Sequence, residues 1–188
     1  MRRDSGYDTF EFDTWERLAA LLPSDRDAGQ FRDCREIGEQ EAGLQLLTHS
    51  LLEHQVPITD RTRVEIEVLA EHWGERFARH DEIAMCVRAS EQDASIRLLP
   101  DKQVEPFEPS EVGITDPATA RMVVIPWFEC LGCSRVVARV HTRQPWGEFL
   151  FQAERYLVLP RSGDAATGGR LFRKTELLDA FALLLTCS

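Results

Sequence analysis

Two cysteines separated by two residues are the most conspicuous candidates for chemistry in this sequence. Cys130 and Cys133 enclose Leu131-Gly132, between two segments of strand-like composition. The spacing allows both thiolates to bind one metal ion such as zinc, because the glycine permits a tight turn, and it also occurs in thiol pairs that transfer electrons. A structural zinc site needs two more ligands, and the sequence has no second pair at this spacing. Three interpretations stay open: zinc at these cysteines, a redox pair, or a hairpin whose cysteines have no function.

Histidine and glutamate pairs four residues apart are the next candidates. His49 with Glu53, and Glu67 with Glu71, have this spacing, which places both members of a pair on one face of a helix. Such pairs could exchange protons or hold a metal ion. Exposed helix residues show the same spacing, and that is the simpler interpretation. His141 lies near the end of a predicted strand, and nothing in the sequence places a nucleophile beside it.

The common motifs for nucleophilic hydrolysis and phosphate binding are missing from the sequence. It contains no G-x-S-x-G elbow, no G-x-x-x-x-G-K-[ST] loop and no G-x-G-x-x-G after a strand. We therefore expect a protein without catalytic activity of its own. An enzyme of unfamiliar type, with a pocket between a sheet and the C-terminal helix, is the alternative.

The net charge of −10 disfavours nucleic acids and anionic membranes as partners, since both attract basic surfaces. Most of the acidic excess precedes residue 80. A solvated surface would explain this composition, and so would a surface that complements a basic protein partner. Under the second interpretation, the partner-binding residues are six glutamates and one tryptophan in a Pro-Trp-Gly turn: Glu39, Glu41, Glu53, Glu65, Glu67, Glu71 and Trp146.

The start of the chain lacks the apolar core of a signal peptide, and no run of about 20 apolar residues follows it. We expect a soluble, cytoplasmic protein that does not enter a membrane. The five cysteines are an odd number in a chain without an export signal, which favours reduced thiols over a disulfide framework. The oligomeric state is not predicted.

The segment 37–75 organises the N-terminal part of the predicted fold. It reads as two helices broken at Val56-Pro57-Ile58, because a proline interrupts a helix. Either Thr59, by its position, or Thr62, by a capping box with Glu65, begins the second helix. Two shorter helices precede this pair. The first is capped by Asp13 or Thr14 and ends before the polar run 24–29, and the second carries Phe31, Cys34 and Ile37. Gly74 can end the last helix, although Phe77, Ala84 and Val87 allow a continuation to Ala89.

Beyond residue 90 the pattern changes from helical spacing to alternation. Strands are predicted at 95–99, 121–129, 135–142 and 148–159, and 100–117 is predicted as a polar loop that is either a domain linker or a wrapped arm. Alternation along 135–142 is typical of a sheet with one wet face. A glycine-rich loop follows at 161–170, and a helix at 174–186 is long enough to cover the sheet. The sequence thus predicts an α+β protein: a unit of three to four helices at 1–90, and an antiparallel meander with a C-terminal helix at 91–188.

One family resemblance lies in the segment 37–75. Its residues are Gly38-Glu39, Ala42-Gly43-Leu44 with Leu46-Leu47, Leu51-Leu52-Glu53 into Val56-Pro57-Ile58-Thr59, and Ile66 through Leu69-Ala70-Glu71 to Trp73-Gly74. This pattern resembles the small helical immunity proteins of the MafI type, which accompany polymorphic or contact-dependent toxins of bacteria. The resemblance implies a cytoplasmic protein that binds and blocks one cognate toxin without chemistry of its own. It extends from Thr14 at most to Trp73, and more than a hundred residues follow it.

Three hypotheses of different class follow from these observations. The first is an immunity-type protein that binds a toxin through an acidic surface. The second is a metal-containing or regulatory interaction module built around Cys130 and Cys133. The third is an enzyme with a pocket beside the C-terminal helix.

Overall fold

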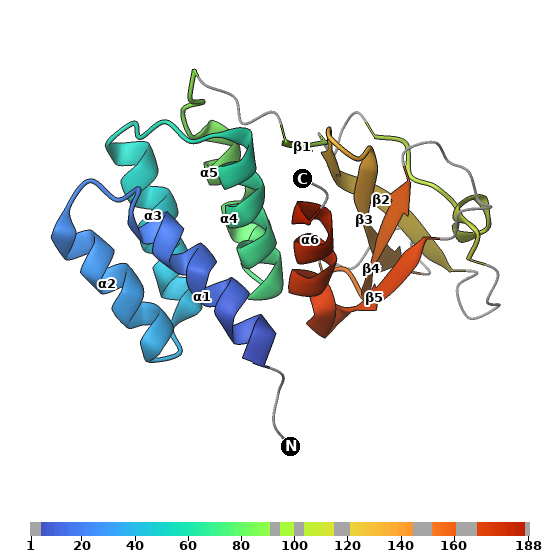
Figure 1. Ribbon diagram of the computed structural model, residues 1–188, viewed down its shortest axis with the longest axis horizontal. Coiled ribbons are helices and arrows are strands. Elements are labelled where there is room, and N and C mark those ends of the chain that lie inside the picture. Colours follow the sequence, from blue (N-terminus) through green and yellow to red (C-terminus); the bar gives the residue numbers. More distant parts are fainter. Residues whose placement is uncertain are drawn as a thin grey trace. The chain divides into compact units, whose positions relative to one another are not determined.

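The computed structural model describes residues 5–90, 95–99, 104–114, 121–144, 152–160 and 169–186. It divides the chain into two compact units, Met1–Asp93 and Ala94–Ser188. The first unit is helical, and the second contains a sheet and an α-helix (Figure 1). The protein is therefore α+β, as predicted, and the predicted boundary after residue 90 lies close to this division.

Among the described residues, the first unit has five α-helices, one more than the largest number predicted. They are α1 (Ser5–Ala19), α2 (Asp25–Glu36), α3 (Gln40–Glu53), α4 (Asp60–His72) and α5 (Arg76–Met85). The predicted cap Thr14 lies inside α1, where its hydroxyl donates to the Phe10 carbonyl oxygen. The polar run 24–29, predicted as a break, begins α2 instead, because the Ser24 side chain accepts a hydrogen bond from the Asp27 N–H and caps the helix.

The core of the helical unit is built where α1, α2 and α3 meet. The rings of Trp15 and Phe31 stack at 4.3 Å between centroids, and both side chains are buried. Gly43 lets α3 approach closely, because a Cβ there would lie 2.9 Å from the Trp15 ring. Since α3 packs on both α2 and α5, the predicted pair of helices is part of a larger bundle.

The predicted break between α3 and α4 is present and is tied down by hydrogen bonds. Thr59 caps α4, accepting from the Thr62 N–H at 3.1 Å, so the alternative start at Thr62 is wrong. The buried Ile58 forms a short parallel bridge with Arg88: the Ile58 N–H donates to the Val87 carbonyl oxygen, and the Ala89 N–H to that of Ile58. The predicted helical continuation after Gly74 is present as α5, but it ends at Met85 and not at Ala89, because the chain after α5 pairs with this break.

Three helices of the first unit end in the same backbone motif. In α2, α3 and α4 a left-handed residue follows the C-cap: Gly38 (φ 85°), Gln55 (φ 50°) and Gly74 (φ 81°). In each case the N–H groups of the left-handed residue and of the residue after it donate to carbonyl oxygens of the last helical turn. This is the Schellman arrangement. These turns fix the direction in which the chain leaves each helix.

Within the described ranges, the second unit contains a five-stranded antiparallel sheet in sequence order. Its strands are β1 (Ile96–Leu98), β2 (Met122–Cys130), β3 (Arg135–Thr142), β4 (Arg155–Pro160) and β5 (Arg170–Arg173). The short 3-10 helices η1 (Pro109–Val112) and η4 (Lys174–Glu176) and the helix α6 (Leu177–Leu185) complete it. β5 was not predicted. The N-terminal part of the predicted strand 148–159 lies outside the described residues.

Both faces of the sheet are covered, so the predicted wet face is wrong. On one face α6 packs against β3, β4 and β5 (Figure 1), and the Phe181 ring meets Phe128 edge-on at 5.5 Å. The other face carries a second apolar cluster, of Val124, Ala138, Val140 and Leu157 with Val112 and Ile114 beside it. Phe107 and Val124 exchange backbone hydrogen bonds, which fastens the segment 104–114 along β2 as an arm.

Candidate functional site

The structure divides the predicted acidic surface into exposed and buried halves. Glu39, Glu41 and Glu53 are exposed. The other three glutamates, all on α4, are buried, with exposed fractions of 4% for Glu65, 1% for Glu67 and 2% for Glu71. Their prediction as partner-binding residues is wrong, since a buried carboxylate offers no surface to a partner. Trp146 lies outside the described residues.

Ion pairs between helices explain two of these buried carboxylates. Glu65 accepts from Arg17 of α1 at 3.1 Å and from Arg61 at 3.3 Å. Glu67 accepts from the Arg76 Nε at 2.8 Å and bonds the His80 Nδ1 at 2.6 Å. A carboxylate taken out of water is tolerated when cations and hydrogen bonds compensate it. These two glutamates therefore connect α4 to α1 and α5.

The exposed glutamates at the α2–α3 turn lie close in sequence to an exposed apolar side chain. Ile37, the C-cap of α2, is 72% exposed, and three exposed carboxylates flank it, at Glu36, Glu39 and Glu41. We name these four residues the acidic corner. The predicted short helix with Phe31, Cys34 and Ile37 is present as α2, but it ends at Glu36, so Ile37 lies just beyond it as the C-cap.

The backbone of the acidic corner is fixed by its own hydrogen bonds. The Gly38 N–H donates to the Arg35 carbonyl oxygen at 3.3 Å, and the Glu39 N–H to that of Cys34 at 2.7 Å. Gly38 adopts φ 85°, which side chains with a Cβ rarely tolerate. The backbone of the corner is thus held in a defined turn.

The electrostatic environment of the acidic corner is negative. Burial raises the pKa of the neighbouring Cys34 thiol, and the charges of Asp33 and Glu39 raise it further. The nearest cation in the sequence, Arg35, lies over the Phe12 ring at 4.8 Å. The C-terminal end of α2 adds the negative pole of a helix dipole. A positively charged partner would find a favourable potential here.

Glu53 lies away from the acidic corner, although it was predicted to act with it. It closes α3 at the end opposite Glu41, roughly 18 Å away along the helix axis. Its exposed side chain pairs with His49 at 3.7 Å.

The cysteine pair lies at the turn between β2 and β3. Cys130 ends β2 and is buried, and Cys133 is half-buried in the turn; both are free thiols. The left-handed residue of this turn is Ser134 (φ 56°) and not Gly132, so the tight turn predicted from the glycine uses a different residue. Within the described ranges no three His, Cys, Asp or Glu side chains are grouped to hold a metal ion.

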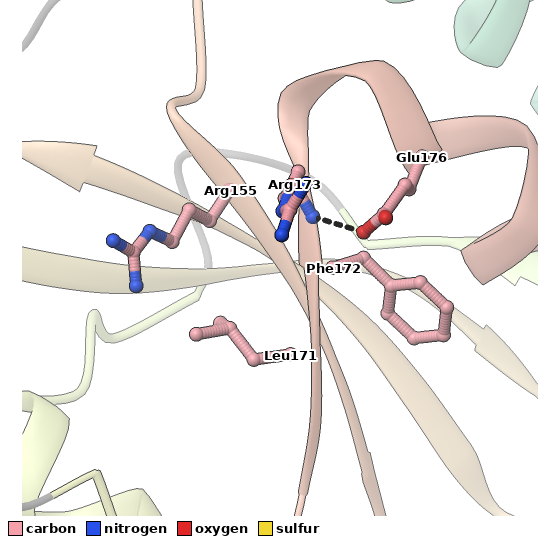
Figure 2. Close-up of a pocket in the computed structure, with 5 residues that line it drawn as sticks. All are labelled: Arg155, Leu171, Phe172, Arg173 and Glu176. Carbon is pink, nitrogen blue, oxygen red and sulfur yellow. Dashed lines mark hydrogen bonds between the residues drawn. The ribbon is translucent and has the colours of Figure 1, made fainter. Parts of the chain in front are cut away.

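A pocket of about 520 Å³ lies beside the edge strand β5. Its lining comes from β4, β5 and η4: Arg155, Leu171, Phe172, Arg173 and Glu176 (Figure 2). The sequence did not single out these residues. The segment Arg170–Arg173 is too short to show an alternation of apolar and polar residues. The register that brings Arg155 opposite Arg173 appears only in the folded sheet.

Comparison with protein-family models, with curated proteins and with solved structures finds no match to this chain. The resemblance of the segment 37–75 to MafI-type immunity proteins therefore stays a prediction. In the part of the chain that the structure describes, no helix combines the length and the apolar character needed to cross a membrane.

Proposed function

We propose that this chain is an immunity-type protein that binds a cognate, basic bacterial toxin and blocks it through the acidic corner. The observation that carries the proposal is Ile37, an aliphatic side chain 72% exposed among three exposed carboxylates. Protein interfaces commonly combine an apolar centre with a polar rim. The resemblance of the segment 37–75 to MafI-type proteins supports the same function independently of this geometry.

The acidic corner has the physical properties that such a partner would use. Its carboxylates steer a basic protein toward it and reject acidic ones. Its hydrogen-bonded turn leaves little conformational entropy to lose on binding, which favours affinity. The proposal needs no catalytic residue in this chain, because occlusion of the toxin is sufficient for protection.

The experiment begins with the full-length chain as bait in its native host and identifies the co-purifying protein by mass spectrometry. The expected partner is a stoichiometric secreted or multidomain protein with a basic C-terminal region. We then expect the double variant Glu36→Lys/Glu39→Lys to slow association strongly at low salt and less at high salt. Glu36→Lys also places a cation at the end of α2, where the helix dipole favours it.

Two matched controls make the test specific to the acidic corner. Ile37→Ala should weaken binding by about tenfold or more, whereas Phe77→Ala, at a side chain 75% exposed on α5, should leave it unchanged. Glu53→Lys makes the charge change of one of those two substitutions at the far end of α3 and should have a small effect. Equal losses from Phe77→Ala and Ile37→Ala would show that the corner is not the interface, and absence of a basic partner would contradict the function.

A further inference from the structure

The pocket beside β5 contains two arginines at directly opposed positions of two neighbouring strands. Arg155 begins β4 and Arg173 ends β5, and they are Cα partners in the antiparallel register. Opposed residues of an antiparallel pair lie on the same face of the sheet. Leu171, two residues before Arg173, shares that face and is 39% exposed. Figure 2 shows Arg155 and Leu171 on one side of β5, with Phe172 on the other.

Two like charges at opposed positions repel each other and destabilise the pair of strands. Within the described ranges, no carboxylate lies at ion-pair distance from either guanidinium. The one acidic residue of the pocket lining, Glu176, accepts the backbone N–H of Arg173 at 2.8 Å and thereby caps η4 (Figure 2). The chain has 32 acidic and 22 basic residues, yet among the described acidic residues none forms an ion pair with these two arginines.

Two further cations lie on the same strand and 3-10 helix, outside the pocket lining. The Arg170 guanidinium stacks on the Phe172 ring at 4.8 Å, and the Lys174 Nζ donates to the Gln152 side chain. The lining itself carries two arginines and one glutamate, an excess of positive charge in an acidic protein.

From this arrangement we infer that the pocket binds a small organic phosphate. Two guanidiniums match the charge of a phosphate monoester, which is close to −2 at neutral pH, and their planar donors bind phosphate oxygens in pairs. The volume of about 520 Å³ lies in the range of small-molecule sites. The exposed Leu171 side chain gives an apolar surface for the organic part of the ligand. This inference does not depend on the proposed toxin binding, which involves the other unit.

The test uses the full-length protein with phenyl phosphate, inorganic phosphate and benzoate, each titrated by calorimetry. We expect phenyl phosphate to bind most tightly, since it offers both the dianion and an apolar ring. Inorganic phosphate should bind more weakly because it lacks the ring, and benzoate should bind more weakly because it has a single charge. If benzoate binds as tightly as phenyl phosphate, the site is one for carboxylates and the inference is wrong.

Variants of the two arginines connect binding to the pocket. Arg155→Gln and Arg173→Gln should each reduce the affinity for phenyl phosphate by about tenfold or more. Neither should lower the melting temperature of the free protein, because each removes a repulsion. Arg121→Gln, at an exposed arginine of the same unit, is the matched control and should bind as the unchanged protein does. Unaltered affinity in Arg155→Gln and Arg173→Gln, or no binding of phenyl phosphate at millimolar concentration, would overturn the inference.

Discussion

Glu67 connects two helices of the first unit through one buried carboxylate. Its partners Arg76 and His80 lie on α5, and the Arg76 side chain is itself 11% exposed. Removing one member of a buried ion pair leaves a charge without compensation, at a cost of about 3 to 5 kcal/mol. We expect Glu67→Ala to lower the free energy of unfolding by about this amount, as measured by urea denaturation.

Glu53→Ala is the matched control for that measurement. The Glu53 side chain is 62% exposed, so its removal should change the free energy of unfolding by less than about 0.5 kcal/mol. An equally small change at Glu67 would show that its ion pairs do not stabilise the bundle.

The burial of these glutamates could not be predicted from their spacing along the helix. Arg17 lies 48 residues before Glu65, and His80 lies 13 residues after Glu67. The sequence contains no signal that Arg17 and His80 would face α4. Two glutamates four residues apart are typical of an exposed helix face. Whether such a pair is exposed or buried depends on tertiary contacts.

A second residue-scale prediction concerns the stability of the protein at acidic pH. Burial lowers the pKa of the His72 imidazole below its usual value of 6.5, and the charge of Glu11 opposes this in part. The unfolded chain therefore binds the proton more readily than the folded one, and this histidine removes stability as the pH falls below about 6.5. In urea denaturation between about pH 7 and pH 5, we expect a smaller loss of stability in His72→Gln than in the unchanged protein. Identical losses would contradict a lowered pKa.

At the scale of elements, the motif at the end of α3 contains a residue of unfavourable type. Gln55 adopts φ 50°, a conformation that costs about 1 kcal/mol for a residue with a Cβ and little for glycine. Gln55→Gly should therefore raise the free energy of unfolding by about 1 kcal/mol. Gln45→Gly, at an exposed position inside the same helix, should lower it by a similar amount. A loss of stability in both variants would show that the left-handed turn is not retained in solution.

The elements that the sequence predicted well carry strong local signals. Pro57 separates α3 from α4, and the alternation along 135–142 gave β3 with its observed bounds, Arg135–Thr142. The elements that were missed carry weak ones. The first turn of α2 is polar, so its start is visible only through the Ser24 cap, and β5 has four residues after a glycine-rich segment. The acidic corner could not be predicted as a site because the spacing of Phe31, Cys34 and Ile37 does not show that α2 ends before Ile37 and leaves its side chain exposed.

At the scale of the whole molecule, each unit has its own buried core. Trp15 and Phe31 anchor the first, and Trp127 and Phe128 the second. A unit with its own core is expected to fold without the other. We expect the fragment 1–93 to show helical circular dichroism and a cooperative thermal transition. A fragment without a cooperative transition would show that the helical unit needs the second half of the chain.

The order of the strands has a consequence for how the protein forms in the cell. Each strand pairs with its neighbour in sequence, from β1 to β5, and the two units are contiguous stretches of chain. Contacts between residues close in sequence require little loop closure, which favours rapid folding. The helical unit precedes the sheet in the chain, so it is synthesised first, and a unit with its own core is expected to fold without the other. Under the proposed function, this order would shorten the delay between translation and protection against the toxin.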